Sequence, residues 1–321
     1  MSIIQGLLSE LSGNWKVAVA LVGSGGIVAL FSAILTTFAL PQVNHRLNKR
    51  FLRVRLETEY EYEQRKKLRD LIGSYHGRIL TAADILKPSL SHLYGLSKLF
   101  ENTETAQWLE IKGQNYQAAD FRFTRIVYRF LAVTTLVQRF EGEAHYIDSR
   151  FAQEEDFKFM NHLKLLQKAA TDIHLFEGNV DLFKGLDRDD VEKRIYADTI
   201  KSDTLRVLSD SYWVKDKFLS PDRFQFKIGR DHTLSPVLQF FANLGPKEKR
   251  LRWYRLAAFH FVLASFINDF GYQYQKTNEK YLEKLLYQIR ETAIRKNLSE
   301  WFDEYELSFP IQEGYSSRAK R

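Results

Sequence analysis

Cysteine is absent from all 321 residues of the chain. Disulfides and cysteine-ligated zinc are therefore excluded, and the composition agrees with a reducing compartment. The chain also lacks the His-Glu-x-x-His and Glu-x-x-His metal patterns, a Walker sequence, a nucleophile elbow and a dinucleotide-binding fingerprint. These absences favour a protein that is not an enzyme and that holds no metal or cofactor.

Charge is missing from one long stretch near the N-terminus, the 24 residues 17–40. A helix of this length is roughly 36 Å long at about 1.5 Å per residue, enough to cross a hydrocarbon core of about 30 Å. A cleaved secretory signal is the alternative, but its apolar core spans only about 7–15 residues. We therefore predict a single transmembrane helix over residues 15–41.

Basic residues flank this stretch unequally, and the imbalance predicts its orientation. The side before it offers Lys16 against Glu10. The side after it carries five basic side chains, Arg46, Lys49, Arg50, Arg53 and Arg55. The positive-inside rule puts the N-terminus outside and the following domain in the cytoplasm, with the chain in the inner (cytoplasmic) membrane. These side chains are expected to face anionic lipid headgroups, or else to act as an orientation signal alone.

Small residues within the predicted membrane helix favour self-association. Gly25, Ala29 and Ala33 recur every four residues, so they share a face that a second helix can approach closely. A generic lipid-facing helix is the alternative. Residues 1–14 have an amphipathic pattern that suits a tail lying in the membrane interface, and a frayed apolar tail is the alternative there. We therefore predict a homo-oligomer in a membrane.

Residues 42–70 are rich in charge and contain neither glycine nor proline. We expect them to continue the membrane helix as a basic, charged juxtamembrane helix. Their apolar heptad pattern breaks down at Thr58 and Glu61, which argues against a long coiled coil.

Residues 71–321 are predicted to form a cytoplasmic all-α domain of several helices, with a subdivision near 178–190 or 220–246 left open. Apolar residues recur at helical spacing over 121–140, 157–173 and 281–301. Residues 252–270 are almost continuously apolar and aromatic. We expect this last stretch at the centre of the core.

Several positions mark breaks between helices. Pro88 is expected to end or kink one helix, and the acidic cluster at 187–190 to cap the start of another. In residues 220–236, the alternation of Phe224, Phe226 and Ile228 predicts a short strand or an extended loop.

A second basic cluster raises the question of nucleic-acid or phosphate binding. The formal charge is +7 and the pI about 9.3, although much of the excess lies beside the predicted membrane helix. Lys247, Lys249, Arg250 and Arg252 precede Trp253, a combination that suits phosphate contact and base stacking. The solvated first turn of a core helix is the more common meaning of such a pattern.

Two further patterns are candidates for chemistry. Arg255 and His260 match the Arg-x4–6-His spacing of HEPN-type ribonucleases, but such pairs are expected by chance in this composition. They are the runner-up catalytic residues. Glu141, His145 and Asp148 have the spacing of one helical face that is able to hold a cation, and a solvated polar face is the commoner explanation.

Two stretches, RDLIGSYHGRILTAADILKPSLSHLYGL (residues 69–96) and YQAADFRFTRIVYRFLAVTTLVQRF (residues 116–140), resemble recurrent helical segments of an uncharacterised bacterial family. In that family an apolar LL-x-AA-x-DL turn precedes a Tyr-containing aromatic helix. The first match rests on Leu80, Ala82, Ala83, Asp84 and Ile85. The Arg-x-x-Asn element expected near residues 91–94 is missing. The resemblance covers under a fifth of the chain and implies no known activity.

These features favour a membrane-anchored, self-associating helical protein that acts by assembly or by binding a partner. One version is a membrane-perturbing effector of bacterial antiviral or stress defence, set off by a cytoplasmic trigger. The alternatives are a membrane-tethered HEPN-like ribonuclease or nucleotide-binding protein, and a passive membrane scaffold. The sequence does not identify the partner or the trigger.

Overall fold

The computed structural model of the chain describes residues 40–96, 109–111, 116, 119–178, 180–245 and 250–311, with side chains from residue 45 onward. The predicted tail of residues 1–14 and nearly all of the predicted membrane helix lie outside these residues. Gly25, Ala29 and Ala33 therefore lie outside them as well. In the part of the chain that is described, which begins at residue 40, no helix has the length and apolarity needed to cross a membrane.

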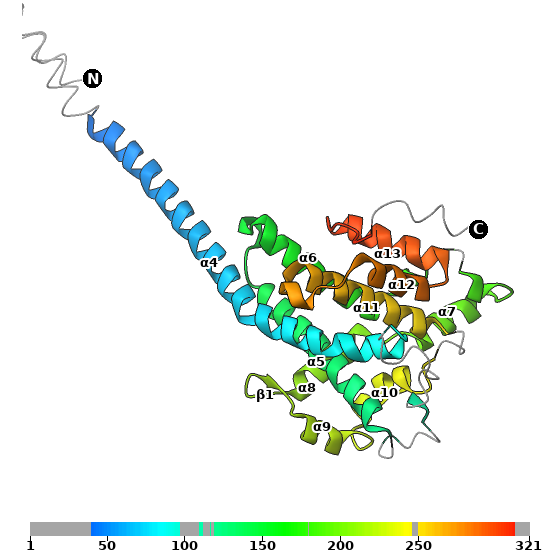
Figure 1. Ribbon diagram of the computed structural model, residues 1–321. Coiled ribbons are helices and arrows are strands. Elements are labelled where there is room, and N and C mark those ends of the chain that lie inside the picture. Colours follow the sequence, from blue (N-terminus) through cyan, green and yellow to red (C-terminus); the bar gives the residue numbers. More distant parts are fainter. Residues whose placement is uncertain are drawn as a thin grey trace, which may run out of the picture. The chain divides into compact units, whose positions relative to one another are not determined.

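The described chain is mostly helical with almost no strand, which confirms the all-α prediction (Figure 1). Its α-helices are α4 (Leu40–Leu93), α5 (Phe121–Ala144), α6 (Glu154–Thr171), α7 (Arg188–Ala197), α8 (Ser202–Tyr212), α9 (Pro221–Lys227), α10 (Ser235–Phe241), α11 (Leu251–Phe270), α12 (Glu279–Gln288) and α13 (Thr292–Glu304). Short 3-10 turns are η5 (Ser149–Phe151), η6 (Ile173–Phe176), η7 (Asp181–Phe183), η8 (His232–Leu234) and η9 (Gln273–Gln275). Two antiparallel strands, β1 (Trp213–Val214) and β2 (Lys217–Phe218), pair Trp213 with Phe218.

The chain divides into two compact units, Met1–Glu63 and Gln64–Arg321. Helix α4 contributes its first part to the former and the rest to the latter. In the described part of the first unit, every side chain from residue 45 to residue 60 is exposed. The exposed side chains include large apolar ones, among them Phe51 at 71%. A helix that packs against a core buries its apolar side chains, and this part of α4 leaves them exposed.

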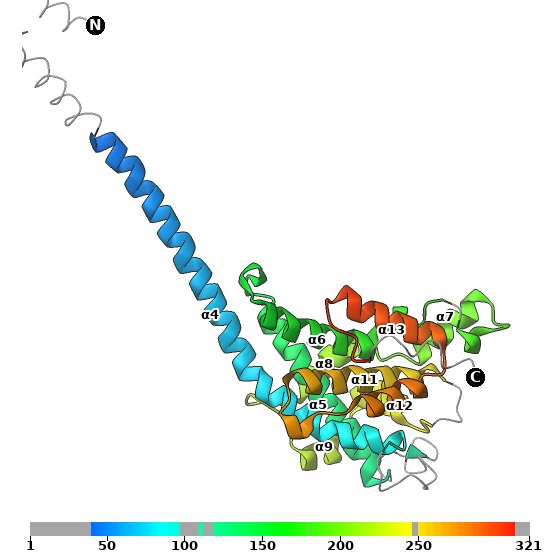
Figure 2. The ribbon, with the colours of Figure 1, turned by 45° about the horizontal axis from the view of Figure 1, so that its top comes forward.

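Helix α11 is the centre of the second unit. Every side chain from residue 251 to residue 267 is buried, and the helix packs against α6 and α12, as both ribbon views show (Figures 1 and 2). A helix that is apolar on all sides is stable only where other elements surround it. The prediction that residues 252–270 form the centre of the core is confirmed.

Aromatic side chains join α11 to the helices around it. The ring of Phe259 lies 5.1 Å from that of Phe130 on α5, measured between centroids. Phe266 contacts Phe159 on α6 at 5.9 Å, and Phe261 contacts Phe302 on α13 at 5.9 Å. Three neighbouring helices therefore hold α11 through edge-on or tilted ring contacts, which are favourable geometries for aromatic pairs.

Local capping explains where several helices begin. The Asp187 carboxylate accepts a hydrogen bond from the Asp190 backbone N–H at 2.8 Å, which starts α7 and confirms the predicted cap. The Asp120 carboxylate caps α5 by accepting from the backbone N–H of Arg122 at 2.7 Å. Helix α6 begins with a capping box between Gln153 and Asp156.

Helix α4 does not end at Pro88 but continues to Leu93, and the alternative of a kink there stays a prediction. The strand predicted within residues 220–236 is wrong. Residues 221–227 form α9 rather than a strand, because Pro221 stands in the first turn, where its fixed φ favours a helix. In this helix Phe224 is buried and Phe226 is 65% exposed, so the two rings lie on different faces of α9.

The importance of the α11 contacts can be measured by shortening one ring. Phe259→Ala is expected to lower the free energy of unfolding by about 3–5 kcal/mol, because it leaves a cavity beside Phe130. Phe226→Ala removes the same atoms from an exposed site and should change it by less than about 1 kcal/mol. Urea unfolding of both variants measures the difference, and equal losses would contradict the central place of α11.

Candidate functional site

The runner-up catalytic residues Arg255 and His260 both lie on α11 and are 1% and 0% exposed. They are five positions apart, which is roughly 140° around a helix axis, so their side chains point in different directions. Arg255 reaches the end of α6, whereas His260 reaches α12. The structure does not bring the two together.

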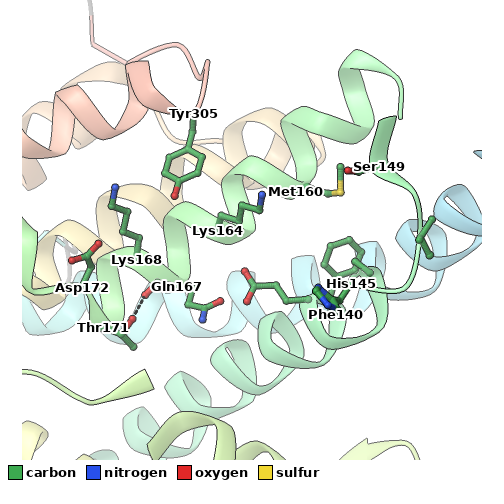
Figure 3. A pocket seen from close by; sticks show the side chains of 13 residues that line it. Phe140, His145, Ser149, Met160, Lys164, Gln167, Lys168, Thr171, Asp172 and Tyr305 are labelled. Carbon is green, nitrogen blue, oxygen red and sulfur yellow. Dashed lines mark hydrogen bonds between the residues drawn. The ribbon is translucent and has the colours of Figure 1, made fainter. Parts of the chain in front are cut away.

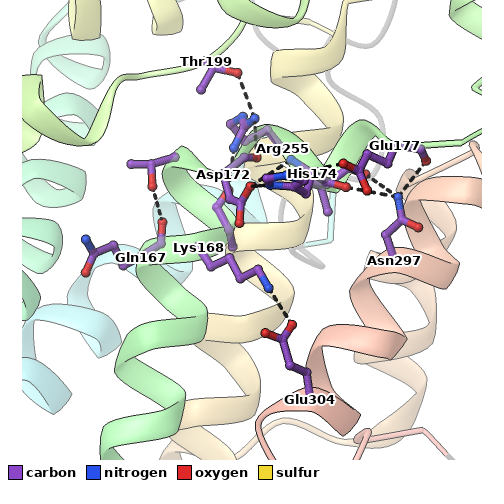
Figure 4. A network of polar contacts seen from close by, with 12 residues as sticks. Gln167, Lys168, Asp172, His174, Glu177, Thr199, Arg255, Asn297 and Glu304 are labelled. Atoms are coloured by element: carbon purple, nitrogen blue, oxygen red, sulfur yellow. Dashed lines mark hydrogen bonds and ion pairs between the residues drawn. The ribbon is translucent and has the colours of Figure 1, made fainter.

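The Arg255 guanidinium is held by internal acceptors (Figure 4). It donates to the backbone oxygens of Ala169 and Asp172 at 3.3 and 2.9 Å, and to the Thr199 hydroxyl at 2.9 Å. It also lies 4.7 Å from the centroid of the Phe176 ring. Burial lowers the pKa of Arg255 to about 9, while the charges of Asp172 and Asp198 oppose that change. The side chain is therefore a cation at neutral pH that ties α11 to its neighbours.

His260 is a neutral core residue. Its Nε2 lies 3.0 Å from the Tyr281 hydroxyl on α12. Burial lowers the pKa of His260 to about 3, and the positive charge of Lys87 lowers it in the same direction. Because the ring is buried and stays neutral, it does not have the exposure that attack on an RNA chain requires.

The basic cluster before α11 is only partly described. Lys247 and Lys249 lie outside the described residues. Arg250 pairs with the buried carboxylate of Asp198. Arg252 is 4% exposed and donates to the backbone oxygens of Gln239 and Phe240 at 2.5 and 3.2 Å. The charge of Arg252 is therefore turned inward, and the phosphate contact of this cluster stays a prediction.

The predicted lipid-facing residues are exposed, in contrast to the buried Arg252. Arg46, Lys49, Arg50, Arg53 and Arg55 are all exposed on the first part of α4. Arg55 forms an ion pair with Glu59 at 2.8 Å, one helical turn away. Solvent screens an exposed i, i+4 pair of this kind, so it adds little to the stability of the helix.

A cavity in the second unit lies between α5, α6 and the residue after α13, and has a volume of about 750 Å³ (Figure 3). Figure 3 shows Lys164, Gln167 and Lys168 along α6, with Tyr305 facing them. The cavity is lined by Phe140, Glu141, Ala144, His145, Ile147, Ser149, Met160, Lys164, Gln167, Lys168, Thr171, Asp172 and Tyr305. Its volume is in the range of small-molecule sites, about 300–1,000 Å³.

Glu141 is the most perturbed carboxyl in this cavity. Burial raises its pKa to about 7, and the charge of Lys164 opposes the rise. With its amide nitrogen toward Glu141, Gln167 donates to Oε1 at 2.7 Å and accepts from Gln138 at 2.9 Å. The carboxyl therefore exchanges its proton near neutral pH and can accept a hydrogen bond or a positive charge from a ligand.

Other charges along the cavity are paired with neighbouring side chains (Figure 4). Lys168 forms an ion pair with Glu304 at 2.6 Å and lies 4.6 Å from the Trp301 ring centroid. Asp172 accepts from His174 at 2.6 Å, and this hydrogen bond, with the charge of Asp172, raises the pKa of His174. The Lys168 contacts connect the end of α6 to α13, whereas the Asp172–His174 hydrogen bond lies between the end of α6 and η6.

The residues considered as cation ligands are not arranged as a metal site. Glu141 and His145 line the cavity, but the Asp148 carboxylate caps η5 and pairs with Arg150 at 2.6 Å. Over the described ranges, no group of three His, Cys, Asp or Glu side chains is placed to hold a metal ion.

Sequence patterns found only part of this cavity. Glu141 and His145 were identified by their helical spacing, whereas Lys164, Gln167 and Tyr305 were not. The cavity brings the end of α5 together with α6 and Tyr305, which are distant in sequence. Helical periodicity carries no signal for such a meeting.

Comparisons with known proteins add no relative: no family model, curated protein or solved structure matches the chain. The resemblance of residues 69–96 and 116–140 to an uncharacterised bacterial family therefore stays a prediction.

The unusual state of Glu141 predicts a pH-dependent effect of Glu141→Gln. Because its folded pKa of about 7 exceeds the unfolded value of 4.5, the stability from its protonated form is complete below pH 4.5 and is lost as pH rises through 7. The variant should be more stable than the parent by about 3 kcal/mol at pH 8 and nearly equal to it at pH 4.5. Urea unfolding across this range measures the difference, with the exposed Glu192→Gln as the control. A constant difference at all pH values would contradict the assignment.

The lowered pKa of His260 predicts a free energy of unfolding that falls, rather than rises, as the pH is lowered. Its folded pKa of about 3 is below the unfolded value of 6.5, so its contribution is present above pH 6.5 and is lost as pH falls. Between pH 6 and 4, His260 should lower the free energy of unfolding of the parent chain by about 1.4 kcal/mol per pH unit. His260→Asn should abolish this dependence. The same unfolding measurements apply, with exposed His232→Asn as the control. A ribonuclease site would instead show loss of RNA cleavage without a change in this slope.

Proposed function

We propose that this chain is a membrane-anchored, self-associating helical protein that acts by assembly or partner binding. The anchor is the uncharged stretch of residues 17–40, with the N-terminus outside and the second unit in the cytoplasm. The single observation that most supports the proposal is the exposed apolar surface of the helix that follows this stretch.

The first part of α4 carries two surfaces of different chemistry. Leu47, Phe51 and Val54 are 44%, 71% and 59% exposed and fall on one helical face. The basic residues Lys49 and Arg53, with Arg46 and Arg50, fall within roughly 100° of arc on another face. An apolar stripe on a helix is stable in water only when another surface covers it.

A second copy of the chain is the proposed cover for the apolar stripe. Gly25, Ala29 and Ala33 would bring two membrane helices together, and the apolar stripe of α4 would extend the same contact beyond the membrane. The basic face would then lie against anionic headgroups, where each charge contributes about 1 kcal/mol.

The effector version of this proposal adds a trigger acting on the second unit. The cavity beside Glu141 is the proposed place for a small trigger, because it has a ligand-sized volume and a carboxyl that changes charge near neutral pH. A passive scaffold would need no such response. The ribonuclease alternative has less support, since Arg255 and His260 are buried and contact different elements.

Paired variants of the full chain test the assembly surface. Leu47→Glu with Phe51→Glu, and separately Gly25→Leu with Ala29→Leu, should each reduce the oligomer to a smaller species. Leu52→Glu with Leu56→Glu is the matched control, because it puts the same charges at 58% and 56% exposed positions on another face of the helix. Cross-linking in native membranes and light scattering in detergent measure the size.

The anchor is tested in the same preparations. Carbonate extraction should leave the parent chain and all three double variants in the membrane fraction. Release of the parent chain by carbonate would contradict the anchor, and an unchanged oligomer in the first two variants would contradict the packing. Depolarisation of a membrane-potential dye by the parent chain but not by the dissociated variants would favour the effector over the scaffold.

A further inference from the structure

A second, smaller cavity in the unit Gln64–Arg321 gathers positive charge. It has a volume of about 250 Å³ and lies between the last turns of α4 and the first turns of α5. We call it the arginine cleft, and its lining consists of Pro88, Ser89, His92, Phe121, Arg122, Arg125 and Arg129. Three arginines and a histidine thus share one small space, and the described residues that line it include no carboxylate.

Helix geometry places the arginines together. Arg122, Arg125 and Arg129 are three and four positions apart, so they lie on one face of α5. Arg129 donates to the Ser89 hydroxyl at 2.5 Å, a contact that fixes its guanidinium across the gap between α5 and α4. Arg125 lies 4.9 Å from the ring centroid of Phe121, which is itself 61% exposed. These contacts hold the guanidinium groups in place before any ligand arrives.

The charges in the cleft repel one another. Burial lowers the pKa of Arg129, and the charge of Arg125 lowers it further. Burial also lowers the pKa of His92, in the same direction as the charge of Arg122. Asp120 offsets part of this charge through its ion pair with Arg122 at 2.9 Å. An incoming anion would offset the repulsion between the charges of Arg125 and Arg129.

We propose that the arginine cleft binds the phosphate group of a phosphorylated ligand. Guanidinium groups present paired N–H donors that match phosphate oxygens, and a doubly charged phosphate answers several of them at once. The volume suits a phosphate group with the rest of its ligand outside, rather than a nucleic-acid backbone running through the site. A soluble phosphate compound and a phosphate lipid headgroup share this chemistry. The proposal does not depend on the membrane anchor or on assembly, because all seven lining residues belong to the unit Gln64–Arg321.

The test uses the full chain in detergent and isothermal titration with inorganic pyrophosphate at low salt. Arg125→Gln and Arg129→Gln should each weaken binding by about tenfold, since each removes a charged hydrogen-bonding partner. Because a glutamine side chain is two bonds shorter than that of arginine, Arg129→Gln removes the contact with Ser89 together with the charge. Arg125→Gln leaves that contact in place, so the two variants together separate the charge from the contact between the helices. Arg206→Gln is the control, because that side chain is 71% exposed and lies elsewhere, on α8. It should bind like the parent chain.

A second titration with a short-chain, water-soluble phosphatidic acid distinguishes the two sources of phosphate. Tighter binding of the lipid analogue, lost in the Arg125 and Arg129 variants, assigns the cleft to a lipid headgroup. Tighter binding of pyrophosphate with the same dependence assigns it to a soluble phosphate compound. Absence of binding by both, binding that is equal in the parent chain and in these variants, or binding only to a long single-stranded oligonucleotide would overturn the proposal.

Discussion

Burial of α11 on all sides is the constraint on which the rest of the second unit depends. A helix with no solvent-facing side gains the apolar contacts of α5, α6, α12 and α13, but its polar groups find partners only inside the protein. Among the described residues, His260 Nδ1 and Arg255 Nε have no hydrogen-bond partner. The two terminal nitrogens of Arg255 do find such partners. They donate to the end of α6 and to Thr199, and these hydrogen bonds fix the segments between α6 and α8 against α11.

The same constraint separates the core from the surfaces that can meet a ligand. In the sequence, the types and spacing of Arg252, Arg255 and His260 indicate a binding or catalytic site. In the structure all three side chains are buried in the core. The side chains that remain accessible lie on the layer that covers α11. They line the cavity beside Glu141 and the arginine cleft. Both cavities thus belong to the helices that cover α11.

The two sites differ in how their charge is balanced. In the larger cavity, Lys168 and Asp172 are paired with Glu304 and His174, and the burial of Glu141 favours its neutral form. In the arginine cleft, like charges are held together by helix geometry and by Ser89. A neutral or cationic ligand suits the first arrangement, and an anion suits the second. The first unit adds a different surface again, in which apolar and basic faces lie on one exposed helix.

The sequence by itself determined the local features: the helical class, the apolar continuity of α11 and the Asp187 cap of α7 all follow from spacing within one turn or one helix. Short-range patterns failed where two local rules competed, as in residues 221–227, where Pro221 favours a helix against the alternation of Phe224 and Phe226. Only the tertiary structure decided which charged residues face inward. The partner of Arg255 at Asp172 is 83 positions away, and that of Arg129 at Ser89 is 40 positions away. Periodicity reports which face of a helix is apolar, whereas the pKa of Glu141 and the gathering of arginines depend on which distant segment covers that face.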